Sequence, residues 1–160
     1  MIVLVGFMGA GKTTVGAALA SALGKPFVDI DRLIEESEGR SISRIFEENG
    51  EEDFRTIEHE TISLVLEGPD SVVALGGGAV EHHGTTDLLA KHFVVYLQIS
   101  FEEALRRVGS DHLRPMLAKA NLRAIYDMRL QYYESVADLV IDSNGMKPER
   151  VVDEIVSKFT

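Results

Sequence analysis

Short apolar runs alternate with longer amphipathic segments along this chain of 160 residues. Runs rich in Val, Ile, Leu and Phe predict strands at residues 2–5, 27–30, 71–75, 93–99 and 139–141. These runs are almost continuously hydrophobic, so we expect strands that are covered on both faces, as in a parallel sheet. The alternation of such strands with helical segments predicts an α/β fold with a parallel sheet.

Two helical regions stand out in the first half of the chain. A helix is predicted at 12–23, followed by Gly24 as a stop signal. Its expected buried side is formed by Val15, Ala18, Leu19, Ala22 and Leu23. A helical block at 31–67 is interrupted near Gly39 and Gly50, which predicts three short helices that could form a subdomain.

Three further helical signals follow in the second half. Ser100 and Glu103 form a capping box that predicts a helix start. Residues 109–120 show no clear period and are predicted to be a mobile loop, after which Asn121 would cap the next helix. Pro148 fits the first turn of a closing helix. The apolar residues expected to face inward from that helix are Val151, Val152, Ile155, Val156 and Phe159.

Charge and composition narrow the possible partners and location. The net charge is −10, from 26 acidic and 16 basic residues, which disfavours nucleic acid and anionic lipid as partners. There is no cysteine, which excludes disulfides and thiol chemistry. No apolar run is long enough for a membrane span, and the first one lacks the features of a signal peptide. We expect a cytoplasmic protein, and the small size and acidic surface favour a monomer.

The strongest local signal is the segment GFMGAGKT at residues 6–13, followed by Thr14. It matches the phosphate-binding pattern G-x-x-x-x-G-K-[ST] between a predicted strand and a predicted helix. The glycines let backbone N–H groups surround a phosphate, and the helix start adds its positive dipole end. The Lys12 ammonium would place a positive charge beside the β and γ phosphates, and the Thr13 hydroxyl would ligate Mg²⁺. Binding of a nucleoside triphosphate follows.

Further along the chain, a pair of aspartates and an arginine–glutamate pair are candidate site residues. Asp29 and Asp31 would point to the same side of a strand, where they could hold hydrated Mg²⁺ and accept a proton from a substrate hydroxyl. A capped turn from strand to helix explains this pair about as well. Arg55 and Glu58 are three residues apart on a predicted helix, so Glu58 could orient the guanidinium for a planar carboxylate. Taken alone, such a pair is more often a surface salt bridge.

The next predicted strand ends in three successive glycines: Gly76, Gly77 and Gly78. A simple turn rarely needs three, so we expect a ligand to approach the bare backbone here. His82 and His83 are adjacent and are expected in a solvated loop rather than in a metal site. Tyr132 and Tyr133 are expected to pack their helix against the sheet. A GTPase is disfavoured, because no N-K-x-D base-reading motif is present.

In this order, the segments closely resemble the shikimate kinase family over essentially the whole chain. The matching segments are the phosphate loop, FVDID at 27–31, FRTIE at 54–58, LGGG at 75–78, LRPML at 113–117, and Arg129 followed by YESVAD at 133–138. The resemblance implies a three-layer α/β/α P-loop kinase with a five-stranded parallel sheet. It also implies a single domain at 1–160, with the phosphate loop at 6–14, a helical substrate subdomain at about 31–60 and a mobile lid at about 109–120.

The resemblance implies an activity as well. The enzyme would transfer a phosphoryl group from ATP to a hydroxyl of shikimate, giving shikimate 3-phosphate and ADP in aromatic amino-acid (chorismate) biosynthesis. ATP phosphates would be bound by Gly9, Ala10, Gly11, Lys12, Thr13 and Thr14. Thr13 would ligate Mg²⁺ directly and Asp29 through water. Lys12, Asp31 and Arg114 would be catalytic, with Asp31 on the reacting hydroxyl and Arg114 in the lid over the transferring phosphate.

The same resemblance implies the remaining contacts. Arg55 and Arg129, with the backbone of Gly76, Gly77 and Gly78, would hold the carboxylate of shikimate. Arg107 would border the adenine. The segment Met146-Lys147-Pro148 lacks the arginine that some members place against adenine, and Lys147 could replace it in part.

Two rival hypotheses stay open. One is a related small kinase of the gluconate or nucleotide type. Arg55 and Arg129 disfavour a neutral polyol as its acceptor, because it offers no carboxylate to hold, and a substrate panel would separate the other acceptors. The other is a non-catalytic nucleotide-binding regulator, which should have lost Lys12, Asp31 or Arg114, whereas all three are present.

Overall fold

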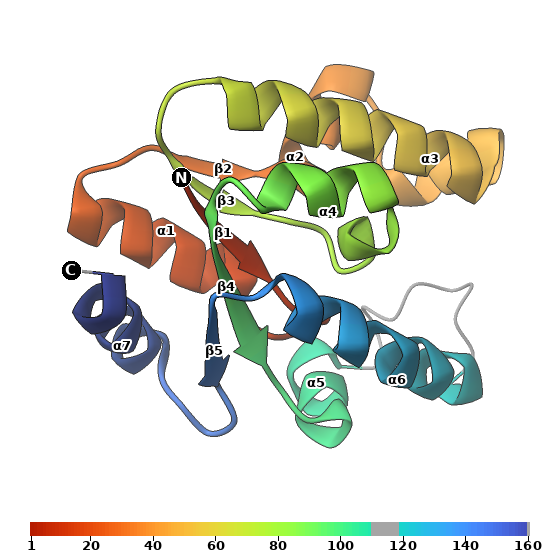
Figure 1. The fold of residues 1–160 in the computed structure, drawn as a ribbon. Coiled ribbons are helices and arrows are strands. Elements are labelled where there is room, and N and C mark those ends of the chain that lie inside the picture. The colour runs from red at the N-terminus through yellow and green to blue at the C-terminus, as the bar shows by residue number, and fades with distance from the viewer. Residues whose placement is uncertain (110–118, 160) are drawn as a thin grey trace.

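One five-stranded parallel sheet forms the centre of the molecule, and the computed structural model describes residues 1–109 and 119–159 (Figure 1). The strand order is β2-β3-β1-β4-β5. The strands are β1 (Ile2–Val5), β2 (Phe27–Asp29), β3 (Val72–Ala74), β4 (Phe93–Gln98) and β5 (Leu139–Asp142). All five predicted strands are therefore confirmed, as is the parallel sheet. The central strands β1 and β3 are buried along their whole length, as their continuous apolar sequences require. The edge strands β2 and β5 are only partly buried, and Val140 is 47% exposed, so the expectation that every strand is covered on both faces was wrong for these two.

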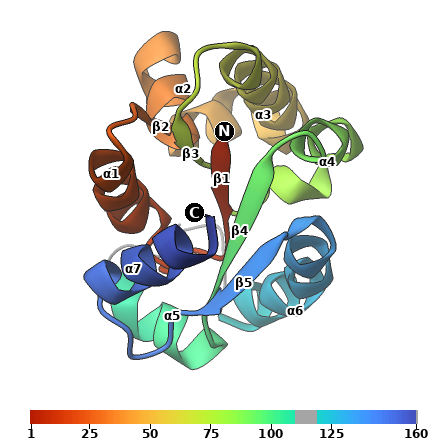
Figure 2. The ribbon, with the colours of Figure 1, turned by 60° about the vertical axis from the view of Figure 1, so that its left-hand side comes forward.

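Helices cover both faces of the sheet and produce the predicted three layers. Figure 2 shows α1 and α7 together on one side and α3, α4 and α6 on the other. The helices are α1 (Lys12–Leu23), α2 (Ile30–Glu38), α3 (Ile42–Glu67), the 3₁₀ turn η1 (Ala79–Glu81), α4 (His83–Leu89), α5 (Phe101–Val108), α6 (Lys119–Val136) and α7 (Pro148–Phe159). Gly50 has non-helical backbone angles inside α3, so the block after β2 consists of three helical pieces, as predicted.

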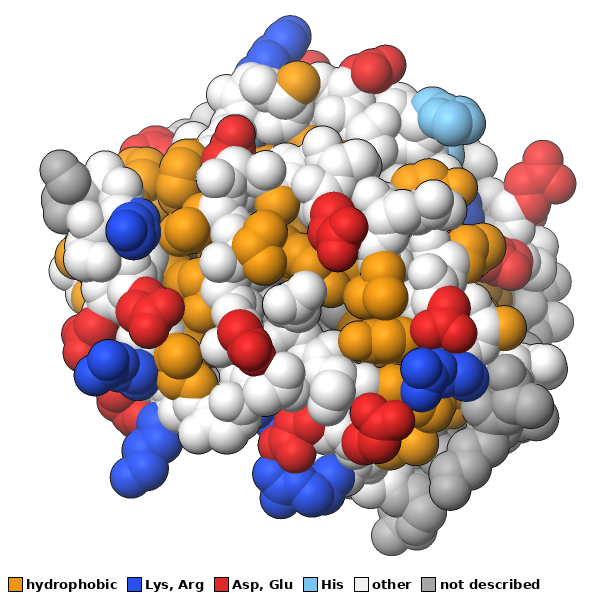
Figure 3. Space-filling view, turned by 60° about the horizontal axis from the view of Figure 1, so that its bottom comes forward, with side chains coloured by type: hydrophobic (Ala, Val, Ile, Leu, Met, Phe, Trp, Pro, Cys, Tyr) orange, Lys and Arg blue, Asp and Glu red, His pale blue; other side chains and the backbone are white. Residues whose placement is uncertain are grey.

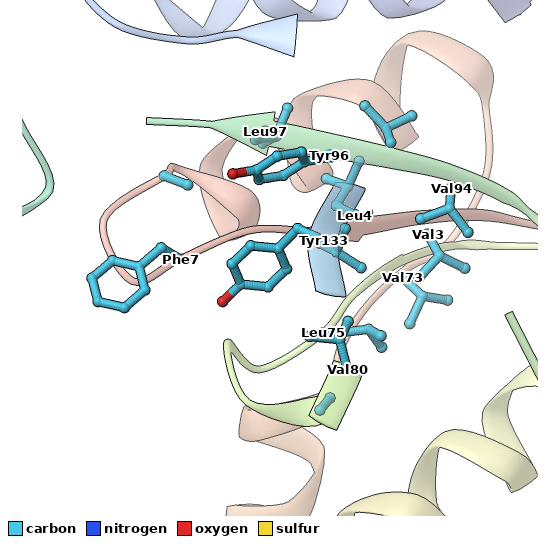
Figure 4. Close-up of a cluster of buried hydrophobic side chains, with 14 of the residues drawn as sticks. Val3, Leu4, Phe7, Val73, Leu75, Val80, Val94, Tyr96, Leu97 and Tyr133 are labelled. Carbon is cyan, nitrogen blue, oxygen red and sulfur yellow. The ribbon is translucent and has the colours of Figure 1, made fainter. Parts of the chain in front are cut away.

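The core lies between the sheet and these helices (Figure 4). Tyr133 of α6 is fully buried and its ring lies 5.1 Å from that of Tyr96 on β4, which ties α6 to the sheet as predicted. The Ser100 hydroxyl accepts from the N–H of Glu103 at 3.1 Å and caps α5. On the face shown in Figure 3, acidic and basic side chains are interspersed with hydrophobic ones. Among the described residues, no helix has the length and apolarity to cross a membrane.

Two predictions about the helix faces were wrong. Ala22 is exposed, and the buried face of α1 passes through Gly16 instead. A Cβ at Gly16 would overlap the ring of Phe27, so the missing side chain brings this part of the helix against β2. Phe159 is 40% exposed at the end of α7, because only part of its ring is covered, by Phe93 at 5.4 Å.

Two boundaries also differ. Helix α6 begins at Lys119 rather than at Asn121, so residues 119–120 are helical and not part of a loop. Lys and Ala are strong helix formers, which favours the earlier start. Residues 110–118, the rest of the predicted loop, lie outside the described part of the chain. Helix α4 was not predicted, and it places His82 at its N-cap and His83 in its first turn instead of in a loop.

Candidate active site

The phosphate loop joins the carboxyl end of β1 to the first turn of α1. Gly11 is the N-cap of α1 and has a φ of 92°, a backbone conformation that favours glycine. It has no side chain to cap the helix, so the first N–H groups of α1 remain available to an anion. The Lys12 ammonium donates to the carbonyls of Gly6 at 2.7 Å and Phe7 at 3.0 Å, which holds the side chain along the loop.

Burial sets the electrostatic character of Lys12. Loss of hydration lowers the pKa of this ammonium to about 8, although the nearby carboxylates of Asp31 and Asp29 act in the opposite direction. Arg129 adds a smaller like-charge effect that also lowers the pKa. A cation buried beside two carboxylates and an arginine is suited to meet an additional anion, because phosphate would offset its desolvation.

Asp29 lies between the strand end and the phosphate loop. Its Oδ2 accepts from the Thr13 hydroxyl at 2.6 Å, and its Oδ1 caps α2 by accepting from the N–H of Arg32 at 3.2 Å. The strand ends at Asp29, so the prediction that Asp31 shares its side of a strand was wrong. Asp31 lies in the first turn of α2, yet both carboxylates line the same cavity. A hydroxyl and carboxylates this close are oxygen donors of the kind that fit Mg²⁺.

Arg55 and Glu58 form a buried pair rather than a surface salt bridge. Arg55 Nη1 donates to Glu58 Oε1 at 2.7 Å, and Glu58 is only 2% exposed. Burial raises the pKa of the Glu58 carboxyl, while Arg55 opposes that shift and Asp31 reinforces it. Glu58 Oε2 and Arg129 Nε are buried without a hydrogen-bond partner among the described residues. A buried acceptor and a buried donor at one site leave polar groups for a ligand to satisfy.

The three glycines let charged side chains approach the backbone. A Cβ on Gly76 would lie 2.7 Å from Asp31 Oδ1, and one on Gly78 would overlap the guanidinium of Arg55 and lie 2.7 Å from Nη2 of Arg129. The two arginines therefore meet over Gly78, although they come from α3 and α6. This convergence is the feature of the site that sequence spacing could not show.

Tyr133 is a contributor that the sequence interpretation assigned only to packing. Its hydroxyl donates to the carbonyl of Gly77 at 2.6 Å and so anchors the glycine segment to α6. Tyr133 lies one helical turn after Arg129, which brings the anchor and the arginine to the same face of the helix. Only that spacing could have indicated the contact from the sequence.

Two neighbouring cavities contain most of the predicted site residues. One, of about 240 Å³, is lined by residues that include Lys12, Thr13, Asp29, Asp31, Arg55, Gly76, Gly77, Gly78 and Arg129. The other, of about 550 Å³, is lined by residues that include Gly9, Ala10, Gly11, Thr14, Arg107, Met146, Lys147 and Pro148. They share the phosphate loop, which lies at the carboxyl ends of the parallel strands, the usual edge for ligands in such sheets.

Arg107 connects the parts of the second cavity. Its guanidinium donates to the carbonyls of Gly9 at 3.3 Å and Ser143 at 2.8 Å, and to Glu103 Oε1 at 3.0 Å. It thus joins the phosphate loop to the segment between β5 and α7. Its predicted place beside adenine stays a prediction, and Arg114 lies outside the described residues.

Comparison with known proteins shows the family and agrees with the fold. The family model described as "Shikimate kinase" matches residues 8–160. A shikimate kinase of Mycobacterium ulcerans is 44% identical over 161 residues, covering 98% of this chain and 88% of that protein. One of Thermobifida fusca is 44% identical over 162 residues, covering 99% and 94%. The structure of Acinetobacter baumannii shikimate kinase in complex with shikimate has a TM-score of 0.94 at 37% identity, covering 99% of this chain and 91% of that one.

Proposed function

Because the chain belongs to the shikimate kinase family and has shikimate kinase activity, we propose a division of that reaction among the residues of its two cavities. ATP is the co-substrate, and the acceptor is a hydroxyl of shikimate, which becomes shikimate 3-phosphate. The observation that carries the proposal is the meeting of the Arg55 and Arg129 guanidiniums over Gly78, in the cavity that also holds Lys12 and Asp31.

The two guanidiniums bind the carboxylate of the acceptor. Arg55 is held by its 2.7 Å bond to Glu58, and Arg129 keeps a buried Nε without a partner among the described residues. Planar guanidiniums match a carboxylate with paired, charge-assisted hydrogen bonds. Backbone at Gly77, fixed by Tyr133, borders the same bound acid. A neutral polyol would leave both arginines without an anion and is disfavoured as the acceptor, whereas gluconate is itself a carboxylate and is separated from shikimate by testing both as acceptors.

At the other end of this cavity, Asp31 and Lys12 act on the reacting groups. Asp31 orients the acceptor hydroxyl and takes its proton as the new O–P bond forms. Lys12 places positive charge beside the β and γ phosphates and stabilises the charge on the transferring group. Phosphoryl transfer needs positioning and charge stabilisation more than a strong base, so an aspartate suffices.

Mg²⁺ fits the oxygen donors at the start of α1. We assign Thr13 as its direct ligand and Asp29 as a ligand through water, since these groups are 2.6 Å apart. Bound there with ATP, the ion supplies positive charge beside the phosphate oxygens. The chain itself contributes the hydroxyl of Thr13, the carboxylate of Asp29 and the N–H groups of the phosphate loop.

The second cavity would receive the nucleoside part of ATP. Gly9, Ala10, Gly11 and Thr14 surround the phosphates from this side, and Arg107 borders the adenine with the segment 146–148. In the domain organisation we propose, residues 31–60 form the substrate subdomain of a single domain. The lid predicted at about 109–120, with Arg114 over the transferring phosphate, stays a prediction, because residues 110–118 lie outside the described part of the chain and residues 119–120 belong to α6.

Steady-state ATP consumption with and without shikimate tests the proposal. Substituting Arg55→Lys or Arg129→Lys should raise the KM for shikimate about tenfold or more and leave ATP affinity unchanged, since lysine lacks the planar fork. Arg123→Lys is the matched control on α6, because Arg123 is half exposed and pairs with Glu102 and Asp127. Gluconate and nucleoside monophosphates complete the acceptor panel. Consumption that is independent of shikimate, or faster with one of the other acceptors, would overturn the assignment.

A further inference from the structure

Outside the contacts assigned above, one carboxylate is directed at an acceptor-binding arginine. Glu81 ends the 3₁₀ turn η1, and its N–H donates to the carbonyl of Gly78 at 3.1 Å. Its Oε2 lies 3.4 Å from Nη2 of Arg129. The two side chains are 22% and 12% exposed, so the pair is mostly shielded from water. Glu81 therefore connects Arg129 to the glycine segment over which that arginine lies.

The geometry brings two guanidiniums of like charge close together. Arg55 and Arg129 both approach the position that a Cβ on Gly78 would occupy, so two positive charges lie close together there. Arg55 has Glu58 as a close partner at 2.7 Å and Glu51 at 3.7 Å. For Arg129, the ion pair found among the described residues is the one with Glu81. Without that carboxylate, repulsion from Arg55 would favour conformations in which Arg129 leaves Gly78.

We propose that Glu81 is a positioning residue that holds Arg129 in its acceptor-binding geometry before the acceptor arrives. This inference rests on the proposed function, in which Arg129 binds the acceptor carboxylate. Glu81 acts through Arg129 and does not touch the reacting atoms. A guanidinium that is already in place loses less conformational entropy when the acceptor binds, and this raises affinity without changing the chemical step.

An opposite effect must be separated from this one. Glu81 also brings negative charge to the edge of the site, and that charge repels an anionic acceptor. Substitution of Glu52 measures the repulsion between a rim carboxylate and the anionic acceptor by itself. Glu52 lines the same rim cavity of about 420 Å³ as Glu81 and Arg55, and its carboxylate forms no ion pair with an arginine of the described chain. If charge at the rim were all that mattered, removing either carboxylate would favour acceptor binding.

The test is steady-state kinetics of the full chain carrying Glu81→Gln, Glu81→Asp or Glu52→Gln beside the wild type. We expect Glu81→Gln to raise the KM for shikimate about three- to tenfold, the range for loss of a partly shielded ion pair. Its kcat should stay within about twofold of the wild type, because the contact acts on binding. Glu81→Asp should recover part of the KM, and Glu52→Gln should leave the KM unchanged or lower it.

A KM for Glu81→Gln that is unchanged or lowered, as for Glu52→Gln, would show that Glu81 only repels the acceptor. A fall in kcat at constant KM would also overturn the proposal. Thermal unfolding of each variant checks the fold. If Glu81→Gln does not fold, kcat and the KM for shikimate are measured for Glu81→Ala instead. Failure of the wild type to phosphorylate shikimate would refute the proposed function instead, so the two failures are distinguishable.

Discussion

Replacing Gly78 by alanine should separate stability from acceptor binding. Gly78 has φ −96° and ψ 0°, angles that alanine can adopt, so the backbone itself gains no strain. Loss of glycine's freedom in the unfolded chain would even stabilise the protein by about 0.4–1 kcal/mol. The new methyl group, however, would occupy the space in which the two guanidiniums meet.

The expected loss of binding follows from the displacement of these groups. Ordinary contact with a Cβ begins at 3.4 Å, whereas Nη2 of Arg129 would lie at 2.7 Å, so it must retreat by 0.7 Å (3.4 − 2.7). The Arg55 guanidinium overlaps the Cβ position and must move further. A hydrogen bond to a charged group contributes about 1.5–3 kcal/mol. Loss of one such bond to the acceptor would raise the KM for shikimate about ten- to a hundredfold.

The assay is shikimate-dependent ADP formation together with urea unfolding of the same variant. Gly24→Ala is the control, because Gly24 has a φ of 63° with nothing within 4 Å of the added Cβ, on the far end of α1. It should lose about 1–2 kcal/mol of stability from the left-handed conformation and keep a normal KM. A normal KM in Gly78→Ala would refute the placement of the two arginines.

Three further outcomes are expected. The pKa of Lys12 is about 8, so kcat/KM for ATP should fall as pH rises through about 8 and this ammonium loses its charge; a flat profile to higher pH would contradict its role. Thr13→Val should lower kcat/KM for ATP about tenfold or more and raise the Mg²⁺ requirement, and Thr13→Ser should keep most activity, because only valine removes the hydroxyl that bonds Asp29. Burial, with His59 and His83 nearby, lowers the pKa of His82 below its ordinary 6.5. The folded protein therefore binds fewer protons there, and the unfolding free energy should decline as pH falls below about 6.5, less steeply in His82→Gln; equal slopes in urea titrations at several pH values would count against this.

Much of the scaffold was predictable from local sequence. The five strands are short apolar runs, and their composition and length are visible without any tertiary contact, although the edge strands β2 and β5 are only partly buried. The phosphate loop at 6–13 was predictable for the same reason, since its glycines, lysine and threonine act within one continuous segment. Gly39 and Gly50 likewise marked the breaks in the helical block, because each acts on the backbone at its own position.

Helix α4 shows where local propensity fails. Its first turn contains Gly84 and Thr85, which are poor helix formers, and its formation depends on contacts with other elements. Thr85 is buried, and its Oγ1 lies 3.0 Å from Nδ1 of His59 on α3. Leu89 is buried in the core. Such contacts outweigh propensity but leave no periodic signal in the sequence.

The acceptor site shows the same division. The nucleotide-binding loop, the paired acidic residues, the three glycines and the arginines that match the shikimate kinase family are all visible in the sequence alone. The meeting of Arg55 and Arg129 over Gly78, the anchoring of Gly77 by Tyr133, and the contact of Glu81 with Arg129 become visible only once the chain has folded. These contacts join α3, α6 and the segment after β3, and their distances depend on how strands and helices pack in space rather than on any local pattern.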